Sequence, residues 1–143
     1  MLKGIIFDMD GVLINSEPFH YRVWKETLRE RGIDLDYEVY KDCIGSTIGT
    51  LMQILHKHYG ISLEDTSLRE EMNAKKEELI RKEGYPPLIP YVKELLEKLY
   101  KGGYGLAVAS SSPLSYIEKV TDHWGIRKYF HSLVSGESVE NPK

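Results

Sequence analysis

Three short apolar segments, separated by longer stretches with helical spacing, constrain most strongly how this chain can fold. Residues 3–7, 106–109 and 132–135 each have the pattern of a short buried strand. The stretches before the second and third segments carry apolar residues on one helical face and end at glycines. Alternating strands and helices are typical of a parallel α/β sheet, so we expect that architecture here.

The gap between the first two apolar segments is too long for a single crossover helix. Residues 16–85 contain several amphipathic helical patterns. The last of these helices is expected to begin at a capping box formed by Ser62 and Asp65. The clearest linker is the sequence YPPLIP at residues 85–90. We therefore expect a discontinuous core of residues 1–15 and 86–143, with an all-helical cap of residues 16–85 inserted after the first strand.

Composition narrows the class of protein further. The 143 residues are 41% hydrophobic and 29% charged, which is typical of a globular chain, and the net charge of -3 gives no general attraction to nucleic acid or anionic membrane. No apolar stretch approaches the ~18 residues of a membrane span, so we expect a cytoplasmic protein. Cys43 is the only cysteine and is interpreted as a small buried apolar residue.

The residues that follow the first apolar segment carry the chemistry. Asp8 and Asp10 lie just past its carboxyl end, where parallel sheets bind ligands, and Gly11 lets the backbone approach a phosphate closely. Two carboxylates this close favour a cation between them and an anionic substrate. Asp8 could attack phosphorus while Asp10 serves as general acid and base. The alternative is a plain polar turn after a strand.

The motifs resemble those of the haloacid dehalogenase-like superfamily. Residues 5–13 (IIFDMDGVL) resemble its first motif, residues 107–110 (AVAS) its second, and Lys143 the lysine of its third. Residues 15–24 (NSEPFHYRVW) are similar to the start of the helical cap in the β-phosphoglucomutase-like branch. The resemblance covers essentially the whole chain and implies a Rossmann-like, three-layer parallel-sheet core with a helical cap.

The resemblance also implies roles for individual residues. Asp8 would be the nucleophile and a metal ligand, and Asp10 the acid/base whose carbonyl also binds the metal. Ser110 would hydrogen-bond the transferring phosphoryl group, and Lys143 would stabilise charge on it. The implied cofactor is Mg²⁺. The expected phosphate-binding set is Gly11, Ser110, Ser111 and Lys143.

One part of the family pattern does not occur in these residues. The fourth motif, an acidic pair on a later strand that completes the metal site, has no counterpart before Lys143. In the family that later strand pairs beside the first, so the first strand is expected to be an exposed apolar edge here. We expect an incomplete core, an inactive isolated chain that could exchange strands with other copies, and a monomer for the complete protein.

The cap is expected to select the substrate. The candidate residues are Glu17, His20, Gly45, Ser46 and Thr47. In the mutase branch a cap arginine binds a second phosphate, and Ile48 stands near that position here, which favours a simple phosphatase. The expected substrate is therefore a small phosphorylated metabolite. A sugar-phosphate mutase and a catalytically inactive binding module are the alternatives.

Overall fold

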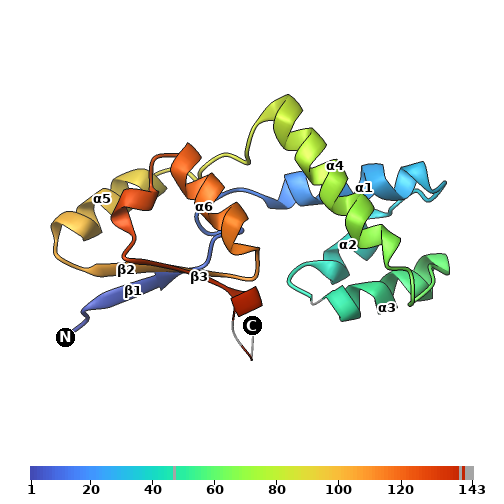
Figure 1. Cartoon of the computed structure of the whole chain (residues 1–143), viewed down its shortest axis with the longest axis horizontal. Coiled ribbons are helices and arrows are strands. Elements are labelled where there is room, and N and C mark those ends of the chain that lie inside the picture. The colour runs from blue at the N-terminus through green and yellow to red at the C-terminus, as the bar shows by residue number, and fades with distance from the viewer. Residues whose placement is uncertain (47, 139, 141–143) are drawn as a thin grey trace. The chain divides into compact units, whose positions relative to one another are not determined.

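The computed structural model of the chain describes residues 1–46, 48–138 and 140. Its elements are shown in Figure 1. In chain order they are β1 (Gly4–Phe7), α1 (Glu17–Glu30), α2 (Tyr37–Cys43), α3 (Ile48–Tyr59), α4 (Ser67–Glu83), α5 (Val92–Lys101), β2 (Gly105–Ser110), α6 (Leu114–His123), η1 (Arg127–Tyr129), β3 (Ser132–Ser135) and η2 (Gly136–Ser138). Among the described helices, none is both long and apolar enough to cross a membrane.

The three strands form one parallel sheet in the order β1-β2-β3. Both α5 and α6 lie on the same side of it (Figure 1), as expected for successive crossovers of one hand. On β2, Leu106, Val108 and Ser110 are buried and the residues between them are partly exposed. The expected α/β sheet with a helical insert after the first strand is therefore confirmed.

The opposite face of the sheet and the free edge of β1 remain apolar and accessible among the described residues. Ile6 is 73% exposed, and it pairs with Ala107 of β2. Val134, which pairs with Ala109, is 38% exposed. Paired residues of parallel strands point to the same face, so these side chains form one apolar strip. The exposed apolar edge expected for the first strand is present.

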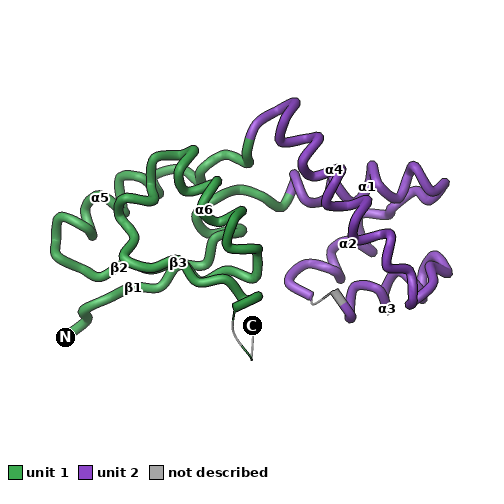
Figure 2. The backbone as a smooth tube through the Cα atoms, viewed as in Figure 1, with its two compact units in different colours: residues 1–17, 85–143 green, residues 18–84 purple. Residues whose placement is uncertain are grey.

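The chain divides into two compact units, one of residues 1–17 and 85–143 and the other of residues 18–84, coloured green and purple in Figure 2. These bounds fall close to the division expected from the sequence. Within the first unit, the segment that leads into the helical insert and the segment that returns from it are joined by an isolated antiparallel bridge between Ile14 and Leu88. The assignment of the two units as catalytic core and substrate cap stays a prediction.

The helical unit contains two hydrophobic clusters of its own. Leu55 is fully buried in the larger cluster, and Leu79 is buried in the smaller one. Trp24 is partly buried and packs against both clusters. Cys43 is buried, as expected, and burial raises the pKa of its thiol. The unit therefore has the apolar contacts of an independent helical domain.

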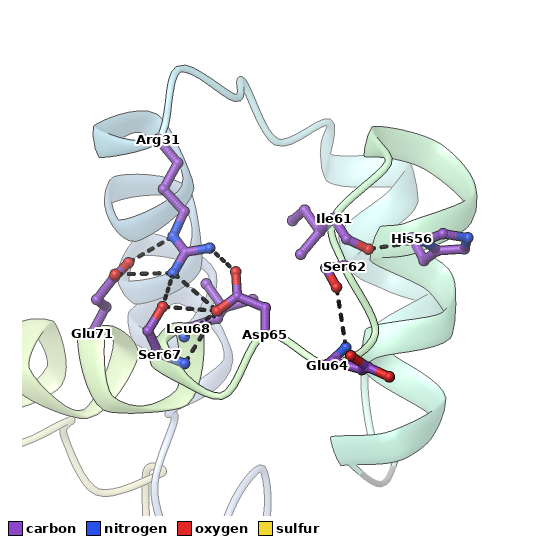
Figure 3. Close-up of polar contacts among 9 residues, drawn as sticks. All are labelled: Arg31, His56, Ile61, Ser62, Glu64, Asp65, Ser67, Leu68 and Glu71. Atoms are coloured by element: carbon purple, nitrogen blue, oxygen red, sulfur yellow. Dashed lines mark hydrogen bonds and ion pairs between the residues drawn. The ribbon is translucent and has the colours of Figure 1, made fainter.

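The capping box expected at Ser62 and Asp65 is wrong, because α4 begins at Ser67. Residues 62–65 form a turn in which the Asp65 backbone N–H donates to the Ser62 carbonyl at 3.1 Å. The Asp65 carboxylate instead accepts the backbone N–H groups of Ser67 at 3.1 Å and Leu68 at 3.2 Å (Figure 3). An aspartate that caps two free N–H groups stabilises the helix start.

Arg31 connects the end of α1 to the start of α4. Its guanidinium forms an ion pair with Asp65, bonds Glu71 at 2.7 and 2.9 Å, and donates to the Ser67 hydroxyl at 2.7 Å (Figure 3). The hydrogen bond from Arg31 holds the pKa of the Asp65 carboxyl well below its usual value, and it also lowers the pKa of Glu71.

Candidate active site

The loop after β1 folds tightly around a buried methionine. Met9 is fully buried, and its carbonyl accepts the backbone N–H groups of Leu13 at 2.9 Å and Ile14 at 3.1 Å. Gly11 has φ of 76°, a left-handed conformation that favours glycine, and its N–H donates to the Ile14 carbonyl at 2.9 Å. The loop therefore holds the residues on both sides of Met9 at the carboxyl end of β1.

Asp8 directly follows the last residue of β1 and is exposed. Its Oδ1 atom accepts the backbone N–H of Met9 at 2.8 Å. Parallel sheets bind ligands at this edge, beyond the carboxyl ends of their strands. Asp8 is thus an accessible carboxylate at the edge of the sheet where ligands of this fold class bind.

The Asp10 carboxylate accepts a serine hydroxyl on each of its oxygens. Ser16 donates to Oδ1 at 2.7 Å, and Ser112 donates to Oδ2 at 3.2 Å. Ser16 lies just before α1, whereas Ser112 lies in the loop between β2 and α6. The two bonds restrain the orientation of the carboxylate and connect the first loop to the second.

Ser110 is the last residue of β2 and is 3% exposed. Its Oγ accepts the backbone N–H of Ser112 at 3.2 Å. The structure therefore brings Ser110 and Asp10 together through Ser112. Ser111, the other expected phosphate-binding serine, is exposed. The expected site residue Lys143 lies outside the described residues.

Tyr116 on α6 belongs to the surroundings of Asp10. Its hydroxyl is buried, and burial raises its pKa well above the usual value, with a smaller contribution from the negative charge of Asp10. The phenol is therefore neutral over the physiological range and adds no second negative charge beside Asp10.

The candidate residues of the cap show local contacts of their own. Glu17 is exposed at the first position of α1, and the ring of His20 packs edge-on against Phe19 with centroids 5.9 Å apart. Gly45 has φ of 74°, and the hydroxyl of Ser46 donates to the carbonyl of Cys43 at 2.7 Å. Thr47 lies outside the described residues. The role of these residues toward a substrate stays a prediction.

The residues after β1 suit a small hard cation. The described part of the chain contains no group of three or more His, Cys, Asp or Glu side chains placed to hold a metal ion. The Asp8 carboxylate and the Asp10 carbonyl are oxygen donors, and Mg²⁺ takes one or two carboxylates while keeping several water ligands. The donor set present therefore fits Mg²⁺ as a partial site.

The chain that carries this site matches a known protein family over nearly its whole length. The sequence profile of the haloacid dehalogenase-like hydrolases matches residues 5–143. The chain belongs to this family. The match begins within β1 and includes all three segments that resemble the family's motifs, so the expected membership is confirmed.

Known haloacid dehalogenase-like proteins resemble the chain over nearly all of its length. Fructose-1-phosphate phosphatase YqaB of Escherichia coli (strain K12) is 29% identical over 141 residues, which cover 98% of this chain and 72% of that protein. Hexitol phosphatase B of the same strain is 30% identical over 146 residues, covering 99% and 64%.

A solved structure of β-phosphoglucomutase from Clostridium difficile shares the fold. It is 27% identical, with a TM-score of 0.78, and the match covers 100% of this chain and 66% of that one. The chain thus spans about two thirds of the length of these relatives. Within the haloacid dehalogenase-like family it belongs to the branch of β-phosphoglucomutases and phosphoglycolate phosphatases.

Two serines that contact Asp10, Ser16 and Ser112, were not among the site residues expected from the sequence. Both donate to Asp10. The run of three serines that begins at the last residue of β2 was a usable signal for Ser112, because a serine run at a strand end places several hydroxyls beside the ligand edge.

Proposed function

We propose that these residues belong to a Mg²⁺-dependent phosphatase that acts on a small phosphorylated metabolite through an aspartyl phosphate on Asp8. The observation that carries this proposal is the pair of carboxylates beyond β1, one exposed and one restrained on both oxygens by Ser16 and Ser112. The family and its named sugar-phosphate phosphatases support the substrate class.

In the first step, an oxygen of Asp8 attacks the phosphorus of the substrate. The bond from phosphorus to the leaving oxygen breaks as Asp10, in its protonated form, donates a proton to that oxygen. The products are the free alcohol and an acyl phosphate on Asp8. The exposed position of Asp8 admits the phosphoryl group, and the restrained Asp10 carboxyl limits the directions in which its proton can be delivered.

In the second step, Asp10 accepts a proton from a water molecule. The water oxygen attacks phosphorus, the bond from phosphorus to Asp8 breaks, and inorganic phosphate leaves. Asp8 is regenerated as a carboxylate and Asp10 is again protonated. A restrained carboxyl can serve both steps, because the alcohol oxygen leaves phosphorus on the side opposite Asp8 and the water oxygen attacks from that same side.

The phosphoryl group needs hydrogen-bond donors during both steps. We assign this role to the hydroxyls of Ser110 and Ser111, the backbone at Gly11 and the ammonium of Lys143. Asp8 and the Asp10 carbonyl would hold Mg²⁺, which when bound neutralises charge on the phosphoryl oxygens. Glu17, His20 and residues 45–47 would contact the rest of the substrate.

The mutase alternative has support from the β-phosphoglucomutase structure. A mutase would pass the phosphoryl group from Asp8 to a second sugar hydroxyl instead of water. It would require a bisphosphate primer and release little inorganic phosphate. Ile48 near the position of the expected cap arginine favours the phosphatase.

The proposal is tested by Asp8→Asn in the complete gene product. Phosphate release is measured with Mg²⁺ across a panel of sugar phosphates and other small phosphate esters. The asparagine keeps the shape of the side chain but cannot form the acyl phosphate, so turnover should be lost. Asp34→Asn, at an exposed loop position of the helical unit, is the matched control. Residual activity above about a tenth of wild type would remove Asp8 as nucleophile.

A further inference from the structure

Ser112 is hydrogen-bonded to Asp10, although the two residues are far apart in the sequence. Its hydroxyl donates to Oδ2 of Asp10 at 3.2 Å, although the two residues are 102 positions apart. Its backbone N–H donates to the hydroxyl oxygen of Ser110 at 3.2 Å. Ser112 therefore contacts, with two different groups, the loop after β1 and the last residue of β2.

Ser112 is itself held by the strand on its other side. The hydroxyl of Ser135, the last residue of β3, donates to the Ser112 carbonyl at 2.6 Å. Ser135 is 1% exposed, and its Oγ accepts the backbone N–H of Glu137 at 3.2 Å. A continuous series of hydrogen bonds thus runs from the end of β3 through Ser112 to Asp10.

We propose that Ser112 is a positioning residue for Asp10 and that Ser135 fixes Ser112 in the orientation this requires. The proposal rests on the proposed function, in which Asp10 transfers protons. The terminal torsion of an aspartate is broad, so an unrestrained carboxylate samples many orientations. Ser16 is only six positions from Asp10, whereas Ser112 ties Asp10 to the neighbouring strand.

The orientation of Asp10 affects the reaction rate because proton transfer acts only over a short range. A general acid acts only within hydrogen-bond reach of the oxygen it protonates, and a displacement of about 1 Å can cost ~10²-fold in rate. Loss of one of two restraints is a smaller perturbation. Removal of the Ser112 hydroxyl should therefore slow the chemical steps while substrate binding is kept.

The test compares Ser112→Ala, Ser112→Thr and Ser135→Ala in the complete gene product. Ser112→Ala should lower kcat about 10-fold with little change in KM, and Ser112→Thr should retain most activity because it keeps the hydroxyl. Ser135→Ala should lower kcat in the same way by a smaller factor. Ser115→Ala, an exposed serine on α6, is the matched control.

A double-mutant cycle identifies the partner. In an Asp10→Asn background, Ser112→Ala should cause no further loss, because the group it positions is already disabled. A full additional loss, or a rise in KM at constant kcat, would overturn the proposal and assign Ser112 to direct substrate contact. If Ser112→Ala fails to fold, Ser112→Cys replaces it, since a thiol keeps the volume but is a weak donor.

Crystal structures separate this proposal from the proposed function. The Asp10 carboxylate should turn away from its wild-type orientation in Ser112→Ala and keep it in Ser112→Thr. An unchanged Asp10 in Ser112→Ala overturns the positioning role even if the enzyme is active. A protein without phosphatase activity, in which Asp10 still reorients, rejects the proposed function and leaves Ser112 as the residue that orients Asp10.

Discussion

The backbone N–H of Asn15 donates to the carbonyl of Pro87 at 2.8 Å, so the two connections to the helical unit run side by side. A second bond, from the N–H of Ile89 to the Leu13 carbonyl at 3.0 Å, continues the pairing. The indole of Trp124 fixes the same segment by donating to the Pro86 carbonyl at 2.9 Å. The segments that lead into and out of the helical unit, residues 13–15 and 86–89, are thus held together beside the loop that carries Asp10.

Asp10→Asn is expected to slow both halves of the reaction. Asparagine can accept one of the two serine hydroxyls on Oδ1 and can donate from Nδ2 to the oxygen of the other. It cannot deliver or remove a proton, so phosphorylation of Asp8 and hydrolysis of the acyl phosphate should each fall ~10²-fold or more. Rapid-quench measurement of both steps in the complete gene product provides the test. If neither step is slowed, Asp10 is not the acid/base.

Activity is expected to depend strictly on a divalent cation, with Ca²⁺ a poor substitute for Mg²⁺. Ca²⁺ takes more ligands at looser geometry, which spoils the alignment of Asp8 with phosphorus. Phosphate release is measured after chelation and again after addition of each metal. Full turnover in excess chelator would contradict the proposed mechanism.

Arg31→Met is expected to destabilise the helical unit most near neutral pH. Arg31 lowers the folded-state pKa of Asp65, so this stabilisation is present above the unfolded-state pKa of about 3.9 and is lost as the pH falls below it. The difference in Tm from wild type should therefore shrink in acid. Thermal unfolding is followed by circular dichroism across the pH range.

The control for this prediction is Arg29→Met, which changes an exposed arginine in the last turn of α1, just before Arg31. It removes the same charge without removing the contacts to Asp65 and Glu71. A pH-independent difference in Tm for Arg31→Met, or an equal effect of Arg29→Met, would show that the ion-pair cluster does not stabilise the unit.

Tyr91→Gly is expected to stabilise the sheet-containing unit. Tyr91 is the only described non-glycine residue with positive φ, at 68°, and its side chain is 80% exposed. Glycine relieves the left-handed strain and loses little burial, so the free energy of unfolding should rise by about 1 kcal/mol. Tyr91→Ala removes the same ring but keeps the strain, so denaturant unfolding should show no comparable gain.

The 143-residue chain is expected to self-associate through the free edge of β1. Ile6 is 73% exposed on a strand that pairs, among the described residues, only with β2. Ile6→Lys should shift the mass measured by light scattering toward the monomer. Leu63→Lys changes an apolar residue that is 54% exposed in the helical unit and should have no such effect. A wild-type chain that is monomeric at high concentration would refute this expectation. Robust phosphatase activity of the 143-residue chain would refute the separate expectation that it is inactive.

The parts of the site that could be predicted are those set by local sequence. Asp8 and Asp10 follow an apolar strand directly, so strand recognition alone places them at the ligand edge. The bond from Ser112 to Asp10 could not be predicted in this way, because it depends on the register between β1 and β2. A shift of register would move Ser112 away from Asp10 without changing any local pattern.

The start of α4 was predicted wrongly because several polar groups compete to cap it. Residues 62–67 contain four side chains able to cap a helix, and the ion pair with Arg31 selects Asp65 as the group that receives the N–H bonds. The left-handed conformation of Tyr91, just before the start of α5, carried no sequence signal, because tyrosine has no preference for that conformation.

The pairing of Gly4 with Gly105 has a kinetic consequence. A contact between residues about a hundred positions apart carries a large loop-closure cost, which slows folding unless the intervening chain is already compact. The helical insert supplies that compaction, because its clusters are closed by residues of the insert itself. We expect the purple unit of Figure 2 to gain protection from hydrogen exchange before β1 does during refolding. The insert would then act as a folding scaffold that shortens the effective distance between the first strand and its partner.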